Sequence, residues 1–380
     1  MPPLLLRASL FLAWLPVVSA QEADGYSHMG RNYGRSMVIT KQGIVATSQA
    51  LASQAGAQIL AKGGTAADAA IAANAVLAVV EPMKNGPGGD LFVLYWDAKT
   101  GKLTGLNASG PAPAALSPKF LEAQGVKSMP QQGIHSFTVP GAVEGWYKIH
   151  ERFGKLPWKD LFQSAIAYAD QGFPVTEVID ESWSDPANLK KIRAYPESVR
   201  VFLPNGGPPK QGDLFQNPDM AKTLRLIAQE GPAAFYKGPI AAALLKTSQS
   251  LGGTMTATDL ASFSSEWVQP ISTDYRGWRV YELPPNSQGM AALEMLNIME
   301  TVPATPLGAF SAVEMHKRIE AMKLSYADVR RYNADPRTSD VPVDRLLSKD
   351  YAKTRAALID PLKAHCEVPN ATPSAVTPPT

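Results

Sequence analysis

The chain has 380 residues, of which 45% are hydrophobic and 18% charged, so it can bury a large core as one α/β domain or two smaller ones. A formal net charge of +2 argues against a nucleic-acid binder that relies on a basic surface. The single cysteine, Cys366, excludes an intrachain disulfide, and the five histidines lack the spacing of metal ligands. We therefore expect neither a metal site nor a bound cofactor.

The N-terminus has the pattern of a cleavable signal peptide over residues 1–20. Arg7 provides a weak positive charge, a mostly apolar run follows, and Val18-Ser19-Ala20 places small residues at the cleavage position. An uncleaved anchor is the alternative, but the apolar run is short for one. We expect a mature protein that begins at Gln21, is periplasmic or secreted, and has no membrane span.

The first elements of the mature chain are predicted to be a strand and two helices. Gly43–Thr47 has the pattern of a short strand, and Ser48 is placed to cap a helix that runs through Leu60. Thr65 and Asp68 form a capping-box pattern before Ala66–Val80, which is apolar on nearly every face. This second helix is therefore expected to be buried.

A glycine-rich loop, Asn85–Asp90, comes directly before the six apolar residues Leu91–Trp96. The loop allows tight turns and close approach of another backbone, which suits a binding site, although a plain sharp turn remains the alternative. The apolar run predicts a strand that is covered on both faces. A turn at Asp97–Gly101 then predicts a hairpin with a second strand at Lys102–Asn107.

The second half of the chain is predicted to be mainly helical. Trp278–Leu283 has the pattern of a strand and Met290–Glu300 that of a helix. Apolar residues at helical spacing mark a longer helix whose stripe we interpret as core: Met315, Ile319, Met322, Tyr326 and Val329. The Pro-rich stretch 366–380 is expected to be loose.

No nucleophile with an accompanying base can be found from the residues alone. Phosphate-binding and dinucleotide-binding glycine motifs are absent from the sequence, as is the Gly-x-Ser-x-Gly motif. The sequence thus predicts segments that could form a binding site, but no nucleophile for catalysis.

Several ordered blocks between Gly43 and Tyr351 resemble γ-glutamyltransferases, which are N-terminal-nucleophile hydrolases. The blocks are GIVATSQALASQAGAQILAKGGTAADAAIAANAVLAVVEP, NGPGGDLF, VPGAVEGWYKIHERFGKLPW, DYRGWRVYELPPNSQGMAALEMLNI and EAMKLSYADVRRYNADP. The resemblance covers the large-subunit half of these enzymes. It implies an α/β (α+β) fold of the four-layer αββα sandwich type, with residues 21–380 as the large-subunit domain.

The resemblance also explains the missing nucleophile. In the family, autocleavage of a proenzyme frees a threonine at the start of the small subunit, whose hydroxyl is the nucleophile and whose α-amine is the base. Thr380 cannot have that role here, so no catalytic residue is expected in this chain, and the implied partner is the small subunit of the same precursor, in a heterodimer. A truncated relic that at most binds ligands is the alternative from another functional class.

The segment Leu106–Pro113 (LNASGPAP) departs from the glutathione-cleaving members, which have an arginine there that binds the substrate α-carboxylate. Asn107 and Ser109 are the residues expected to contact substrate, and Pro111 occupies another plausible position for the arginine. Without a cation, the segment favours other γ-glutamyl amides or the acyl amides of the related cephalosporin acylases over glutathione. An arginine from elsewhere in the chain is the remaining alternative.

Overall fold

The computed structural model describes residues 38–303 and 308–368, and the chain divides into two units, 1–41 and 42–380. In the first unit, the described residues 38–41 are exposed and contain no helix or strand. The predicted signal peptide and most of the predicted loose tail lie outside the described residues. Within the described ranges, no helix is both long and apolar enough to span a bilayer.

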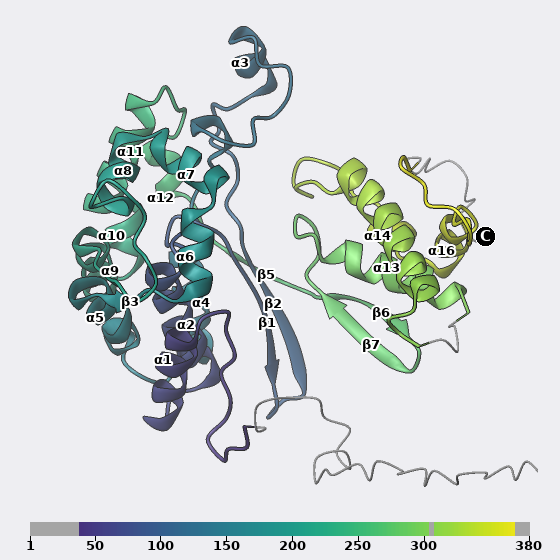
Figure 1. Ribbon diagram of the computed structural model, residues 1–380, viewed down its shortest axis with the longest axis horizontal. Coiled ribbons are helices and arrows are strands. Elements are labelled where there is room, and N and C mark those ends of the chain that lie inside the picture. The colour runs from purple at the N-terminus through teal and green to yellow at the C-terminus, as the bar shows by residue number, and fades with distance from the viewer. Residues whose placement is uncertain (1–37, 304–307, 369–380) are drawn as a thin grey trace, which may run out of the picture. The chain divides into compact units, whose positions relative to one another are not determined.

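Most helices of the second unit up to residue 261 gather around one large hydrophobic core (Figure 1). They are α1 Ala50–Ala61, α2 Ala66–Val80, α4 Ala142–Phe153, α5 Gln163–Gln171, α6 Glu177–Ser184, α7 Pro186–Arg193, α8 Pro196–Phe202, α9 Pro218–Glu230, α10 Pro232–Tyr236, α11 Pro239–Ser250 and α12 Ala257–Ala261. Helix α3 Pro118–Ala123 has no buried residue and projects away from this core. The predicted buried helix is confirmed as α2, with the capping box between Thr65 and Asp68. The Asp68 carboxylate also accepts the backbone N–H groups of Lys155 and Leu156, which ties α2 to the turn after α4.

The start of this unit differs from the sequence prediction. Gly43–Thr47 forms no strand, and the first helix is capped by Gln49 instead of Ser48. The Ser48 hydroxyl donates to Glu81 Oε2 at 2.7 Å, so this side chain joins two distant segments and does not cap the helix.

Strands β1 Leu91–Asp97, β2 Lys102–Ala108 and β5 Glu266–Val268 form an antiparallel sheet in the order β1-β2-β5. The hairpin of β1 and β2 is the predicted one, whereas β5 was not predicted. Helix α4 packs closely on this sheet at Gly145, where a Cβ atom would lie 2.6 Å from the Cβ of Ala108. The remaining strands pair as β3 Phe173–Pro174 with β4 Leu214–Phe215, and β6 Ile271–Tyr275 with β7 Trp278–Glu282.

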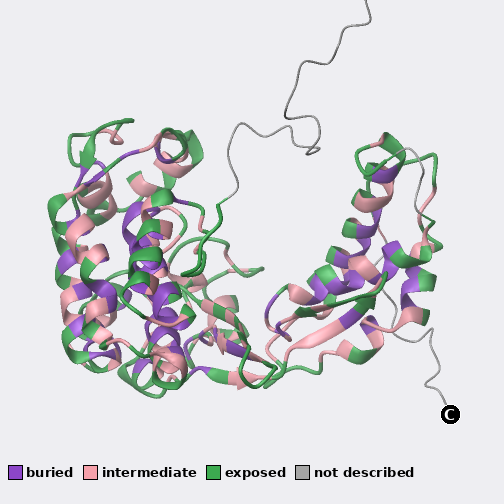
Figure 2. Ribbon diagram, turned by 90° about the horizontal axis from the view of Figure 1, so that it is seen from below, coloured by how far each residue is buried: buried purple, intermediate pink, exposed green. Residues whose placement is uncertain are grey.

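The prediction that β1 is covered on both faces is wrong for the described chain. Leu91, Val93 and Tyr95 pack against the core, but the alternate residues Phe92, Leu94 and Trp96 are exposed. Successive side chains of a strand point to opposite faces, and the helices in the described ranges cover only one of them. One face of β1 is therefore apolar and open. Figure 2 shows the described chain coloured by burial, with buried stretches in purple along the helices.

In the last part of the chain, one helix packs on the β6–β7 hairpin and the other helices pack around that helix (Figure 1). These helices are α13 Gly289–Thr301, α14 Ala312–Tyr332, α15 Val343–Leu346 and α16 Lys349–Ala356. Two small apolar clusters hold them together, with Met290 and Val329 in one and Ile298 and Leu324 in the other. The predicted strand and helix at 278–301 are confirmed.

The apolar stripe on α14, which we predicted to be core, is exposed except at Val329. Met315, Ile319, Met322 and Tyr326 are 38–45% exposed. The buried face of the helix is instead formed by Ala321, Leu324, Ser325 and Asp328. Polar residues take part in this core, so a search for apolar periodicity alone selects the wrong face.

Candidate functional site

Asn107 and Ser109, the two residues expected to contact substrate, line one small cavity of about 210 Å³. Its walls come from four places: the end of β2, strand β5, the loop before α13 and the turn that follows α14. Antiparallel pairing places Asn107 opposite Glu266 of β5. The structure thus brings the two predicted residues together with residues far away in the sequence.

The neutral wall of this cavity is a connected network of hydrogen bonds. Asn107 Nδ2 donates to Asn286 Oδ1 at 2.8 Å, and Asn286 Nδ2 donates to Ser109 Oγ at 3.1 Å. The backbone N–H of Ser109 donates to Asn107 Oδ1 at 3.0 Å. These bonds hold the three side chains in fixed positions in the absence of a ligand. Polar groups in fixed positions give a small-molecule site its specificity.

The charged wall is formed by Arg337, Asp335 and Glu266. Arg337 Nε donates to Asp335 Oδ1 at 2.9 Å, and Nη2 donates to Oδ2 at 2.6 Å. The guanidinium thus binds the carboxylate in a bidentate manner. Arg337 Nη1 is 3.5 Å from Glu266 Oε1. The Arg337 guanidinium lowers the pKa of Asp335, which keeps this carboxylate ionised.

Arg337 is the functional candidate that the sequence analysis missed. The segment Leu106–Pro113 contains no arginine, but the turn after α14 supplies one to the same cavity. The last block of the family resemblance ends at Pro336, one residue before Arg337. The matching block that ends at Asp335-Pro336 could therefore have drawn attention to Arg337, the next residue. Nothing in the sequence pointed to Glu266.

The glycine-rich loop Asn85–Asp90 borders the cavity through its last residue. Asp90 Oδ2 accepts from Ser109 Oγ at a long 3.4 Å. Burial raises the pKa of Asp90, and hydrogen bonds from the backbone of Gly110 and from Ser109 oppose that rise. Gly86, Gly88 and Gly89 do not have φ in the left-handed region, so the turn does not require glycine for its backbone angles.

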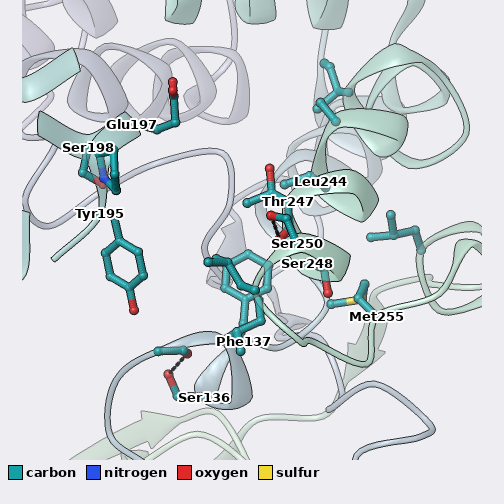
Figure 3. A pocket seen from close by; sticks show the side chains of 17 residues that line it. Ser136, Phe137, Tyr195, Glu197, Ser198, Leu244, Thr247, Ser248, Ser250 and Met255 are labelled. Carbon is teal, nitrogen blue, oxygen red and sulfur yellow. Dashed lines mark hydrogen bonds between the residues drawn. The ribbon is translucent and has the colours of Figure 1, made fainter. Parts of the chain in front are cut away.

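A larger cavity of about 800 Å³ lies elsewhere, between the loop near Gly133 and helices α8 and α11 (Figure 3). Its lining is mainly apolar, and Tyr195, Phe137 and Met255 are among the side chains that surround it. The hydroxyl groups of Ser136 and Ser250 are bonded to nearby backbone carbonyls. The smaller cavity, with its converging charged and amide groups, is the better candidate for recognition of a polar substrate.

The lining of the smaller cavity contains no evident nucleophile. The Ser109 hydroxyl donates to the Asp90 carboxylate, yet the lining contains no histidine or lysine that could act as its base. Within the described residues, no group of three His, Cys, Asp or Glu side chains could hold a metal ion. The arrangement suits recognition of a polar head group by charge and hydrogen bonds.

Comparisons with known proteins agree with this fold over nearly the whole described chain. The structure of Helicobacter pylori gamma-glutamyltranspeptidase matches with a TM-score of 0.80 and 32% identity, over 90% of this chain and 97% of that one. The cephalosporin acylase of Bacillus halodurans matches with a TM-score of 0.78 and 38% identity, over 87% of this chain and 63% of that one. The fold is therefore the α+β fold of N-terminal-nucleophile hydrolases.

The sequence comparisons identify the same group of proteins. The chain is 38% identical over 323 residues to the glutathione hydrolase-like YwrD proenzyme of Bacillus subtilis (strain 168). This match covers 85% of this chain and 61% of the relative. It is 37% identical over 328 residues to the acylase ACY 1 proenzyme of Pseudomonas sp. (strain SE83), covering 84% and 58%. The chain thus spans less than two thirds of these curated relatives. The sequence model described as gamma-glutamyltranspeptidase matches residues 52–379, and the chain belongs to that family.

Proposed function

We propose that this chain is the large-subunit portion of an exported enzyme that cleaves γ-glutamyl or similar acyl amides by hydrolysis or transfer. The family match over residues 52–379 supports the reaction class, and relatives named as glutathione hydrolase proenzymes support the substrate class. In this proposal, the nucleophile is a threonine at the start of a small subunit made from the same precursor, and the two subunits form a heterodimer.

The observation that carries this proposal is the open apolar face of β1 beside the polar cavity. Phe92 is exposed on that face, and it is the antiparallel pairing partner of Asn107, which lines the cavity. An exposed apolar sheet face of this kind favours burial by a second layer. A second sheet packed there would place its own residues next to Asn107, where a nucleophile could reach a bound substrate.

Asn107 and Ser109 are proposed to contact the substrate. Asn107 and Ser109 present amide and hydroxyl groups to the cavity, and Asn286 holds both in place. These groups can donate and accept hydrogen bonds, so they suit the polar end of a γ-glutamyl compound.

An acylase of the cephalosporin-acylase type is the second candidate function. The similarity to the Bacillus halodurans cephalosporin acylase favours it, because the structure and the sequence match about as well as those of the gamma-glutamyltranspeptidases. An acylase without need for an amino-acid head group would hydrolyse glutaryl amides at least as well as γ-glutamyl amides.

The test is to express the chain alone and together with its proposed small subunit, and to assay γ-glutamyl and glutaryl anilides. The proposal expects no turnover by the 380-residue chain alone and clear turnover by the pair. Hydrolysis by the chain alone contradicts the assignment of the nucleophile to a small subunit. Inactivity of the pair on both anilides supports instead the relic, a protein that at most binds ligands.

A further inference from the structure

Another cavity, of about 550 Å³, lies where α4 meets the end of α9 and the start of α10 (Figure 1). Its volume falls within the roughly 300–1,000 Å³ of sites for small molecules. It shares one lining residue, Phe263, with the smaller cavity described above and none with the large apolar cavity. The proposed function assigns no ligand to it.

Four aromatic side chains line this cavity in two pairs. The rings of Tyr147 and Trp158 meet edge to face, with their centroids 5.5 Å apart. The ring centroids of Tyr236 and Phe263 are 5.8 Å apart. A hydrogen bond holds one ring of each pair: Trp158 Nε1 donates to a carbonyl of α9 at 2.8 Å, and Tyr236 Oη donates to the Pro140 carbonyl at 2.7 Å. These two rings are therefore fixed in the absence of a ligand.

Two carboxylates and one ammonium group also line the cavity. The Glu144 side chain is 15% exposed, and one of its oxygens accepts the backbone N–H of Ser265 at 2.8 Å. Its other oxygen lies 3.9 Å from Lys148 Nζ, so this lysine offsets part of its charge. Glu230 and Lys237 are both exposed. Glu230 is thus the carboxylate most available to a ligand, and Lys237 is the charge that opposes it.

The cavity also lies at the C-terminal end of α9, a helix of 13 residues, where Gln229, Glu230 and Gly231 line it. The last carbonyl groups of a helix carry partial negative charge, which favours a cation nearby. Pro232 follows and has no N–H with which to satisfy them. The face of an aromatic ring is also negative, and it attracts a cation within about 6 Å of the ring centroid. The rings, Glu230 and the helix end therefore favour the same sign of charge in a ligand.

We propose that this cavity binds a small organic cation of the quaternary-ammonium class, with the aromatic rings around its methyl groups and Glu230 as its counter-charge. A quaternary ammonium group has no N–H to donate, so ring faces and a diffuse negative charge suit it better than a single strong acceptor does. A metal ion would need several oxygen, nitrogen or sulfur ligands. Within the described residues, no group of three His, Cys, Asp or Glu side chains provides such a set.

Choline and its neutral isostere 3,3-dimethyl-1-butanol test the proposal. The two compounds have the same shape and the same hydroxyl group, and only choline carries a charge. Titrations of the full chain followed by NMR measure affinities into the millimolar range. Choline is expected to bind roughly tenfold more tightly than the alcohol, because only the cation interacts with the ring faces and Glu230. Equal binding of the two compounds, or no binding of choline, overturns the proposal.

Three variants assign the effect to this cavity. Glu230→Gln is expected to weaken choline binding about two- to fivefold, and Lys237→Gln to tighten it by a similar factor, because both charges are exposed. Tyr147→Leu keeps an apolar side chain but removes one ring, and it should weaken choline about three- to tenfold with little effect on the alcohol. Glu151→Gln is the matched control, since Glu151 is an exposed residue of α4 that does not line the cavity. A loss in the control equal to that in Glu230→Gln, or a weaker affinity in Lys237→Gln, contradicts the proposed site.

Vesicles of phosphatidylcholine distinguish two sources of the same chemical group. Sedimentation of the chain with these vesicles that choline reverses identifies a lipid head group as the ligand, whereas binding of choline without sedimentation identifies a free cation. Neither measurement depends on hydrolysis of the anilides, so inactivity of the assembled protein would reject the proposed function and leave this site in place.

Discussion

The side chain of Asn107 donates a 2.8 Å hydrogen bond to the side chain of Asn286, which is 179 positions away in the sequence. This bond joins the end of β2 to the loop before α13. The same Asn286 amide also donates to Ser109, and its backbone carbonyl accepts from Asn333. One asparagine therefore sets the positions of the neutral side chains of the cavity.

Replacing Asn286 with alanine is expected to destabilise the protein and loosen the cavity. The change removes two side-chain hydrogen bonds and leaves Asn107 and Ser109 without these partners. Because polar groups shielded from water then lack a partner, the free energy of unfolding should fall by about 1–3 kcal/mol. Urea unfolding should show a lower free energy of unfolding for Asn286→Ala, with the exposed Asn205→Ala as control. Equal stability of the two variants contradicts a central role for Asn286.

Two glycine positions near the cavity are expected to respond in opposite ways to alanine. A Cβ at Gly110 would lie 1.7 Å from the carbonyl oxygen of Val139, whereas a Cβ at Gly88 meets nothing within 4 Å. Gly110→Ala should lower the free energy of unfolding by about 1–3 kcal/mol or more. Gly88→Ala should leave it unchanged or raise it by about 0.4–1 kcal/mol, because alanine restricts the unfolded chain. Chemical unfolding of both variants checks the contrast.

The sequence allowed good prediction where the signal was local. The capping box at Thr65 and the hairpin after Leu91 both depend on residues within a few positions of one another, and both are present. The prediction failed where burial depends on distant elements. Phe92 looked like core because its own strand is apolar, but no part of the described chain covers that face of β1.

The candidate site shows the same limit. Asn107 and Ser109 could be found from a single segment, and the structure places both in the cavity. Arg337 and Glu266 could not, because their proximity to Ser109 arises from packing between segments far apart in the sequence. An isolated arginine after a helix has no periodicity or spacing that distinguishes it from a solvated surface charge.

The exposed apolar residues of α14 lead to a prediction about association. Met315, Ile319, Met322 and Tyr326 form one open apolar face, and an open apolar face promotes self-association. Ile319→Lys with Met322→Lys should reduce self-association of the isolated chain in sedimentation experiments, with little change in the free energy of unfolding. Ala321→Lys on the buried face is the contrast and should prevent folding. Unaltered sedimentation of the double variant argues against this face as an association surface.

Export is the prediction that concerns the N-terminus. If residues 1–20 are a cleavable signal peptide, the mature protein recovered from the periplasm or medium should begin at Gln21. N-terminal sequencing measures this directly. Replacing Ala20 with a bulky residue should slow cleavage, since signal peptidase reads small residues there. A cytoplasmic protein that retains Met1 contradicts the prediction.

A buried carboxyl group on α13 is expected to control how stability depends on pH. Glu294 is inaccessible to solvent, and Asp328 of α14 is its neighbour. Burial, followed by interaction with Asp328, raises the pKa of Glu294, so this group keeps its proton at neutral pH. Asp328 also accepts from Tyr351 Oη at 2.7 Å and pairs with Arg355 at 3.0 Å. Asp328 thus has hydrogen-bonding and charged partners besides Glu294, whose own carboxyl group carries the proton.

The free energy of unfolding should therefore fall as the pH rises from acidic to alkaline. The unfolded chain releases the Glu294 proton near pH 4.3, while the native protein keeps it, so the native state binds more protons above about that pH. The stabilising contribution is complete below the unfolded-state pKa and is lost towards the raised native pKa, with a slope of up to about 1.4 kcal/mol per pH unit.

Glu294→Gln keeps the shape and a donor for Asp328 but cannot ionise. Urea unfolding between pH 5 and pH 8 should show a flatter decline for this variant than for the parent and for the exposed control Glu181→Gln. If Glu294→Gln declines as steeply as the parent, another group is responsible for the pH dependence.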